Sequence, residues 1–266
     1  MIDKKLILTK LRENPYLTGR ELGSMLKVSV STANRYIRNC TNLSRSERIA
    51  QSNKRRAHAP IHVTEEMNQV ILGSLLGDGC VFYKNSNCVF AETHSTVQRE
   101  YAQYKYQLLK KDLNIKLEEQ KGYVSHIDGR AILENGRIVM TSETNVAFNK
   151  YRREWYPSGK KEVPESVYEL GALGLAIWFM DDGTSNKSSF YLSTQGFNHE
   201  SQLILVDMMK KNFNIECHVH KQKNTEILYI CAKDKQRFIN MIRPYICSSM
   251  IYKIIGHDKQ GELLES

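Results

Sequence analysis

The stretches ILGSLLGDG (residues 71–79) and LAIWFMDDG (residues 175–183) decide the fold of this chain. Each is an apolar helical segment that ends in an acidic residue followed by glycine, at Asp78 and Asp182. Glycine inside a helix costs about 1 kcal/mol relative to alanine, so the small residues in both segments need a compensating reason. Close approach of two helix backbones supplies one, and we expect these two helices to pack together.

The sequence around the two stretches repeats as well, which indicates two copies of one structural unit. After each motif come two alternating segments, a longer helix, two more alternating segments and a closing helix. The longer helices end in similar phrases, KKDLNI (110–115) and KKNFNI (210–215). The predicted fold class is α+β, with two pseudo-symmetric αββαββα repeats over residues 62–163 and 164–266. The predicted strands cover residues 80–84, 87–93, 117–124, 135–141, 188–194, 215–221 and 226–232.

Packing of the two motif helices would bring Asp78 and Asp182 together at the helix ends. Two carboxylates in such proximity repel each other and raise the pKa of one of them, and a divalent cation removes the conflict. Hard oxygen ligands of this type suit Mg²⁺, with Mn²⁺ as a substitute. The unpaired carbonyl groups of Gly77 and Asp181 add oxygen ligands, so we expect a metal site of these four residues.

The two motifs resemble those of the LAGLIDADG homing endonucleases in their single-chain, two-motif form. The second motif is followed by YLSTQGF (191–197), IRPYI (242–246) and MIYKI (250–254), in the order typical of the omega-intron type. The first motif is looser but retains Asp78 at the place of the catalytic acid. The resemblance extends over residues 62–266.

The resemblance implies further catalytic residues. Family members carry a basic residue late in each repeat. In the first repeat this residue is Lys161 or its neighbour Lys160, and in the second repeat it is Lys253. They also carry a polar residue on a strand beside each acid, and Gln195 and His94 stand at these places. Each residue also has a plain structural interpretation, the lysines as surface charges and the polar pair as caps at strand ends.

The resemblance further implies a metal-dependent, site-specific endonuclease that hydrolyses one phosphodiester in each strand of double-stranded DNA, within a long asymmetric target. Two repeats supply two active sites, so a monomer is expected to cut both strands. Two other functions stay open, a transcription regulator on the same scaffold and an RNA maturase that binds intron RNA. Retention of both acids and both lysines favours the endonuclease, because binding alone needs no metal ligands.

Charge and strand patterning also point to DNA. The chain carries 38 Lys and Arg against 29 Asp and Glu, a formal charge of +9, which favours a polyanionic partner over a neutral metabolite. Helices on one face of each sheet would leave the other face open. Alternate residues of a strand share a face, so Ser189, Tyr191 and Ser193 are predicted to reach base edges in the major groove.

Residues 1–43 are predicted to form a small helical domain. The pattern at 18–21, TGRE, is that of a capping box, and a turn at 27–29 leads into a polar, basic helix. Arg35 and Arg38 would lie on its exposed face. Two short helices joined by a tight turn resemble a DNA-binding helix-turn-helix, with an ordinary helical hairpin as the alternative.

Residues 44–61 are polar, without apolar periodicity, and we expect an extended linker. Its basic cluster of Lys54, Arg55 and Arg56 would lie along a phosphate backbone or in a minor groove, or would be a solvated tether. The preceding domain would bind the same duplex as the repeats or an operator of its own gene.

The six cysteines include no CxxC pair, so we expect reduced thiols in a reducing compartment. The start of the chain, MIDKKLILTK (1–10), lacks the pattern of a secretory signal. The longest apolar run, residues 173–180, is too short to cross a bilayer. Together these features predict a cytoplasmic protein with no membrane partner.

Overall fold

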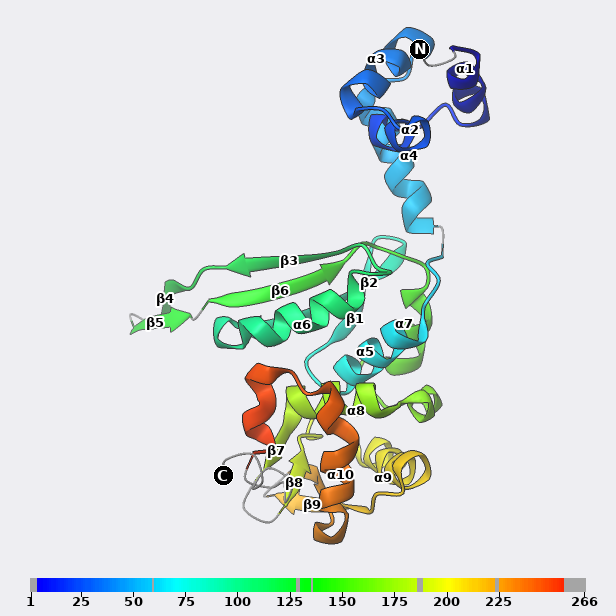
Figure 1. Cartoon of the computed structure of the whole chain (residues 1–266). Coiled ribbons are helices and arrows are strands. Elements are labelled where there is room, and N and C mark those ends of the chain that lie inside the picture. The colour runs from blue at the N-terminus through cyan, green and yellow to red at the C-terminus, as the bar shows by residue number, and fades with distance from the viewer. Residues whose placement is uncertain are drawn as a thin grey trace, which may run out of the picture. The chain divides into compact units, whose positions relative to one another are not determined.

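The structure is a computed structural model, and it divides the chain into two compact units, residues 1–60 and 61–266 (Figure 1). The residues that it describes are 4–58, 60–127, 130–134, 136–185, 189–222 and 225–255.

The N-terminal unit is helical over its described residues. Its helices are α1 (Lys4–Glu13), α2 (Gly19–Leu26), α3 (Val30–Cys40) and α4 (Arg45–His58). The predicted capping box is present, since the Thr18 hydroxyl accepts from the Glu21 N–H and Glu21 accepts from the Thr18 N–H. Lys27 adopts a φ of 52° in the turn between α2 and α3. Leu22 and Ile37 are fully buried in the small core that these helices share.

The segment after α3 is helical, so the expectation of an extended linker is wrong for Arg45–His58. Ser44 and Glu47 form a second capping box, in which the Ser44 N–H donates to Glu47 Oε2 at 2.8 Å and the Glu47 N–H to Ser44 Oγ at 3.2 Å. The Ser52 hydroxyl donates to Glu21 Oε1 at 2.7 Å and ties α4 to α2. The pattern Ser-x-x-Glu is itself a helix-start signal that the interpretation of this segment overlooked.

The larger unit has the predicted two-repeat arrangement, with antiparallel four-stranded sheets in the orders β1-β2-β6-β3 and β7-β8-β10-β9. The first repeat contains α5 (Glu65–Leu76), β1 (Cys80–Lys84), β2 (Asn87–Ser95), α6 (Arg99–Leu109), β3 (Ile115–Gln120), β6 (Arg137–Ser142) and α7 (Phe148–Trp155). The second contains α8 (Ala172–Asp182), β7 (Gly183–Ser185), β8 (Phe190–Leu192), α9 (His199–Phe213), β9 (Cys217–Gln222), β10 (Thr225–Ile230) and α10 (Lys235–Ile242). Short 3₁₀ helices cover Thr96–Gln98, Glu165–Glu169, Ala232–Asp234, Arg243–Tyr245 and Ser248–Lys253. The predicted fold class is confirmed.

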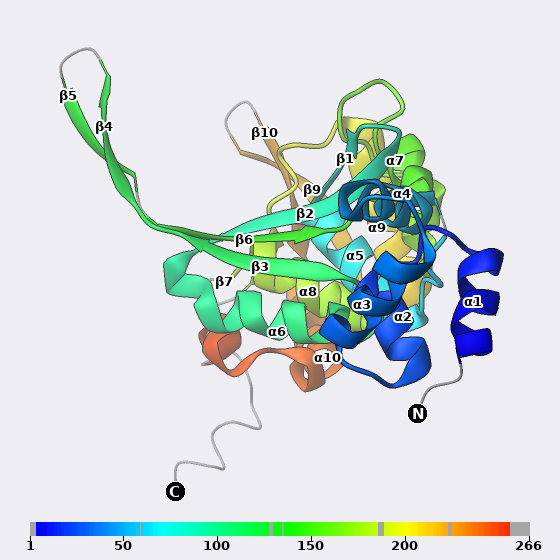
Figure 2. The same ribbon diagram turned by 90° about the horizontal axis from the view of Figure 1, so that it is seen from above.

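The first repeat carries an additional hairpin that the strand prediction missed. Strands β4 (Tyr123–Ile127) and β5 (Arg130–Glu134) pair antiparallel. Figure 2 shows that they continue from the ends of β3 and β6, beyond the four-stranded sheet. The predicted single strand at 117–124 is therefore two strands, separated by a lysine and a glycine, and glycine weakens a strand interior.

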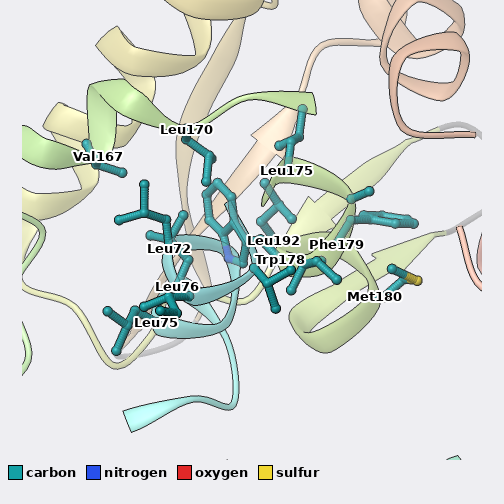
Figure 3. Close-up of a cluster of buried hydrophobic side chains, with 14 of the residues drawn as sticks. Leu72, Leu75, Leu76, Val167, Leu170, Leu175, Trp178, Phe179, Met180 and Leu192 are labelled. Carbon is teal, nitrogen blue, oxygen red and sulfur yellow. The ribbon is translucent and has the colours of Figure 1, made fainter. Parts of the chain in front are cut away.

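Helices α5 and α8 pack side by side at the centre of this unit, as the small residues predict. A Cβ on Gly73 would lie 2.4 Å from the carbonyl oxygen of Gly174, and a Cβ on Gly77 would lie 2.4 Å from Cβ of Asp181. Only hydrogen fits at these two positions, which confirms the close approach. Figure 3 shows the buried apolar side chains around the contact, among them Leu72, Leu75, Leu76, Leu175, Trp178, Phe179 and Met180.

We expect Gly73→Val to lower the free energy of unfolding by about 1–3 kcal/mol, because the added side chain meets backbone that cannot move without separating the helices. Urea denaturation followed by circular dichroism measures this. The matched control is Gly196→Ala, where a Cβ would meet nothing within 4 Å. Equal destabilisation by the two substitutions would contradict the tight helix contact.

Candidate active site

The two predicted acids lie at the ends of the packed helices. Asp78 follows Gly77, the C-cap of α5, and Asp182 is the last residue of α8. The Asp78 N–H donates to Asp181 Oδ2 at 3.4 Å, so the two helix ends are joined directly. Burial and the nearby charge of Asp78 raise the pKa of Asp182 to about 6. The structure thus brings both acids together, while their catalytic role stays a prediction.

A pocket of about 390 Å³ opens at the end of α8. Its lining residues are Asp181, Asp182, Gly183, Thr184, Ser185, Ser193, Tyr252 and Lys253. Gln195 is exposed on the turn after β8 and does not belong to this lining. Ser193 stands in its place, and its N–H donates to the carbonyl oxygen of Asp182 at 3.0 Å. The polar residue beside this acid is therefore Ser193, which directly follows β8, rather than Gln195.

Lys161 lies at the end of α5. Its Nζ donates to the carbonyl oxygens of Gly79 at 2.8 Å and Gly77 at 3.3 Å. Burial lowers the pKa of Lys161. The neighbouring Lys160 is exposed, so the geometry favours Lys161 as the basic residue of the first repeat.

Lys253 occupies the equivalent place at the end of α8. Its Nζ donates to the carbonyl oxygens of Met180 at 2.6 Å and Asp181 at 3.4 Å, and burial lowers its pKa. Cations are favoured at helix C-termini, where the carbonyl dipoles point outward. The carbonyl groups of Gly77 and Asp181, predicted as metal ligands, thus each accept from a lysine ammonium group.

A group of charged side chains is buried behind Asp78, and the sequence interpretation missed most of it. Lys105 on α6 forms an ion pair with Glu92 on β2, and its Nζ lies 3.1 Å from both carboxylate oxygens of Asp181. The Tyr101 hydroxyl donates to Asp181 Oδ1 at 2.6 Å. Burial alone would lower the pKa of Lys105, but Asp181 and Glu92 outweigh it and raise that pKa. Glu92 and Lys105 stand at inward positions of their elements, which is the signal that could have revealed them.

His94 belongs to the same group. Its Nε2 lies 3.1 Å from Glu92 Oε1 and its Nδ1 lies 3.5 Å from Asp78 Oδ2. Neither contact has hydrogen-bond geometry, so both ring nitrogens are buried without a hydrogen-bond partner among the described residues. One ligand atom from each of Asp78, Glu92, His94 and Asp181 lies within 4.8 Å of the others. Hard oxygen donors with an unsatisfied imidazole fit a divalent cation.

The strand registers correct the alignment of His94 with Gln195. Counted along the strand pairs from the Asp-Gly of each motif, Thr194 is the counterpart of His94 and Ser95 that of Gln195. The sequence alignment was one residue out, because the connections between the two strands differ in length in the two repeats.

The three predicted DNA-contacting residues lie in or directly beside β8 and have different surroundings. Ser189 is buried and its hydroxyl donates to the Tyr229 hydroxyl at 3.1 Å, so a tyrosine of the same face covers it. Tyr191 pairs with Tyr229 in register, with ring centroids 5.3 Å apart, and both are half-buried on that face. Ser193 lies in the pocket beside Asp182.

The basic residues of the N-terminal unit are described in part. Arg35 and Arg38 are exposed on α3, as predicted. The side chains of Lys54, Arg55 and Arg56 lie outside the described residues, and their backbone is part of α4.

All six cysteines carry free thiols. Among the helices in the described part of the chain, none combines the length and the apolar character that a bilayer crossing requires.

The fold and the site define a two-repeat protein in which acid-bearing helices meet between two open sheets. The sequence model of the LAGLIDADG DNA endonuclease family matches residues 68–238, well over half of the chain. The chain therefore belongs to the LAGLIDADG DNA endonuclease family. A second model, described as winged helix-turn-helix DNA-binding, matches residues 4–43. Over residues 4–58 the structure shows only helices, so α4 stands where a wing would follow α3.

Two curated relatives illustrate the similarity. The probable intron-encoded endonuclease 1 of Wickerhamomyces canadensis is 43% identical over 119 residues, which are 41% of this chain and 51% of that protein. The chain thus spans about half the length of this relative. The cytochrome b mRNA maturase bI2 of Debaryomyces hansenii is 28% identical over 197 residues, which are 71% of this chain and 74% of that protein.

Among solved structures, the homing endonuclease I-WcaI bound to its DNA recognition sequence has the same fold. The superposition gives a TM-score of 0.64 at 24% identity and covers 82% of this chain and 96% of that chain.

We expect Asp182→Asn to raise Tm by about 2–4 °C at pH 8 in EDTA. Burial and the charge of Asp78 raise the pKa of Asp182 in the folded protein from its ordinary value of 3.8 to about 6. The ionised carboxylate therefore destabilises the fold above pH 6. At pH 5 the folded carboxyl group is protonated and neutral like an amide, so the gain should shrink.

Thermal unfolding of the variant and the wild type at both pH values measures the effect. Asp207→Asn is the control, because hydrogen bonds from Lys211 and Tyr168 lower the pKa of exposed Asp207. A pH-independent gain for Asp182→Asn, or an equal gain for the control, would argue against a strained carboxylate at position 182.

Proposed function

We propose that this protein is a site-specific endonuclease that cuts both strands of double-stranded DNA within a long asymmetric target. The observation that supports it most is the pseudo-symmetric pair of centres at the ends of α5 and α8. Each centre combines an acid with a buried lysine that donates to backbone carbonyl groups at the end of the motif helix. The pairs are Asp78 with Lys161 and Asp182 with Lys253. Family membership and the intron-encoded relative point the same way.

Asp78 and Asp182 would hold the metal, which we propose to be Mg²⁺, with Mn²⁺ as a substitute. Such a cation polarises a scissile phosphate and lowers the pKa of water. The raised pKa of Asp182 and the unsatisfied nitrogens of buried His94 are properties expected of a site built for a positive charge. Lys161 and Lys253 would offset negative charge that develops on the phosphate.

The open sheet faces would contact the bases, and they differ between the repeats. Strand pairing puts Thr93, Lys116 and Arg137 on the open face of the first sheet, where they are exposed. On the second sheet the corresponding face carries Tyr191 and Tyr229. Two unlike surfaces would recognise two unlike half-sites, which supports an asymmetric target.

We keep the division into a helix-turn-helix domain (1–43), a connecting segment (44–61) and two repeats (62–163 and 164–266) as part of the proposal. The exposed Arg35 and Arg38 would add phosphate contacts, on the same duplex or on an operator. The proposal includes monomeric action and a reducing compartment such as the cytoplasm, consistent with six free thiols.

RNA maturation is the second candidate, because a relative of similar length carries that name. Cleavage of DNA needs the proposed metal ligands, whereas binding of intron RNA does not. Substitution of one acid should therefore abolish the first activity and leave the second. A regulator that only binds DNA is less favoured, since both acids and both lysines are present at the helix ends.

We expect Asp78→Asn and Asp182→Asn each to slow double-strand cleavage at least about a hundredfold, because each removes a proposed metal ligand. The double variant, which should still bind, first selects a target duplex from random-sequence DNA. The wild type is then incubated with that duplex in Mg²⁺, and products are resolved on denaturing gels.

Asp207→Asn, an exposed acid on α9, is the matched control and should cut like the wild type. Tight binding by the wild type without cutting in Mg²⁺ or Mn²⁺ would overturn the endonuclease proposal. Stimulation of intron splicing that survives both acid substitutions would establish the maturase candidate.

Arg35→Ala/Arg38→Ala should weaken binding to a random-sequence duplex and reduce the salt slope of log K by about 1–2, because phosphate contacts are lost. Fluorescence anisotropy over a range of KCl concentrations measures the slope. Lys10→Ala, which breaks an exposed pair with Glu13 on α1, is the control. An unchanged slope in the double variant would refute a phosphate-binding role for α3.

A further inference from the structure

The buried charged group of the first repeat has no equivalent among the described residues of the second. The strand registers and the paired phrases at 110–115 and 210–215 relate the repeats by one common offset. By that offset Leu192 is the counterpart of Glu92, and Leu205 is the counterpart of Lys105. All four side chains are buried. The same places in the fold therefore hold an ion pair in one repeat and two leucines in the other.

This difference shows that the fold does not need the ion pair. Taking two charges out of water carries a large desolvation penalty, and apolar replacements of similar volume are often neutral or stabilising. The second repeat is an internal example, because Leu192 and Leu205 fill its core with 0% exposure. A reason for Glu92 and Lys105 has to come from what they contact.

Their contacts lead to one catalytic centre. Lys105 Nζ holds both carboxylate oxygens of Asp181 at 3.1 Å, and Asp181 Oδ2 accepts the N–H of Asp78 at 3.4 Å. On the other side, Glu92 lies 3.1 Å from His94, whose second nitrogen lies 3.5 Å from the Asp78 carboxylate. Asp181, which Lys105 holds, thus contacts the backbone of Asp78. His94, which lies beside Glu92, is near the Asp78 side chain.

Asp182 has no such support among the described residues. The motif alignment makes Gly77 the counterpart of Asp181, so no carboxylate stands there beside the Asp182 backbone, which is part of α8 itself. Asp181 itself occupies the space that a side chain on Gly77 would need. Only one of these two motif positions can carry a carboxylate, and it serves the opposite helix.

Building on the proposed function, we propose that Lys105 is a positioning residue for the Asp78 centre alone and that the two cleavage centres are therefore inequivalent. It orients Asp181 through both carboxylate oxygens, and Asp181 fixes the backbone at Asp78. Loss of Lys105 should impair cleavage of one strand and spare the other.

The test is strand-resolved cleavage of the selected duplex, with a different label on each strand. Lys105→Met removes the ammonium group. Glu92→Leu/Lys105→Leu copies the apolar solution of the second repeat and removes both members of the ion pair together. Lys111→Met is the matched control. Lys111 follows α6 and forms an exposed ion pair with Glu66, which this substitution breaks.

Asp78→Asn identifies the strand that the Asp78 centre cuts, because that substitution slows its cleavage most. Both variants should cut this strand about ten- to a hundredfold more slowly than the wild type does, and should cut the other strand at the wild-type rate. Nicked duplex should therefore accumulate, whereas the control should yield linear product as the wild type does. A destabilised but otherwise intact enzyme would lose both rates in proportion.

Equal slowing of both strands would overturn the inference while leaving the endonuclease proposal intact. Wild-type rates in the double variant, or a bias toward the other strand, would do the same. Absence of cleavage by the wild type itself would overturn the proposed function, and the inference with it.

Discussion

The close contact of α5 and α8 is the constraint on which the rest of the structure depends. It exists because Gly73 and Gly77 present no side chain to the opposite backbone. Two helix C-termini consequently meet at one point, and each of them carries an acid. The two sheets lie on either side of this contact within one compact unit, so the acids stand between the repeats (Figure 1).

The same contact concentrates negative charge. Carboxylates and outward-pointing carbonyl groups meet at the helix ends, where burial and Asp78 raise the pKa of Asp182. Buried lysines offset this negative charge. Lys161 and Lys253 donate to the carbonyl groups, and Lys105 lies between Glu92 and Asp181. Binding of a further cation would stabilise the ionised form of a carboxylate whose pKa is raised in this way.

The two repeats share a backbone plan but have diverged in their interiors and on their open faces. Leucines fill the second repeat where Glu92 and Lys105 stand in the first. Tyrosines lie on the second sheet where smaller or charged side chains lie on the first. A single chain can diverge in this manner because its two halves have separate sequences, whereas identical subunits share one sequence.

The sequence by itself determined the features that are local or periodic. The paired motifs, the fold class, the lysines and the capping box at Thr18 and Glu21 all follow from short patterns, and so does the helix start at Ser44 once its pattern is noticed. Only the tertiary structure decided that Ser193 rather than Gln195 stands beside Asp182, and that Asp181 meets Lys105. These outcomes depend on strand register and on contacts between residues far apart in the chain, and register changes with turn length in a way that no local pattern records.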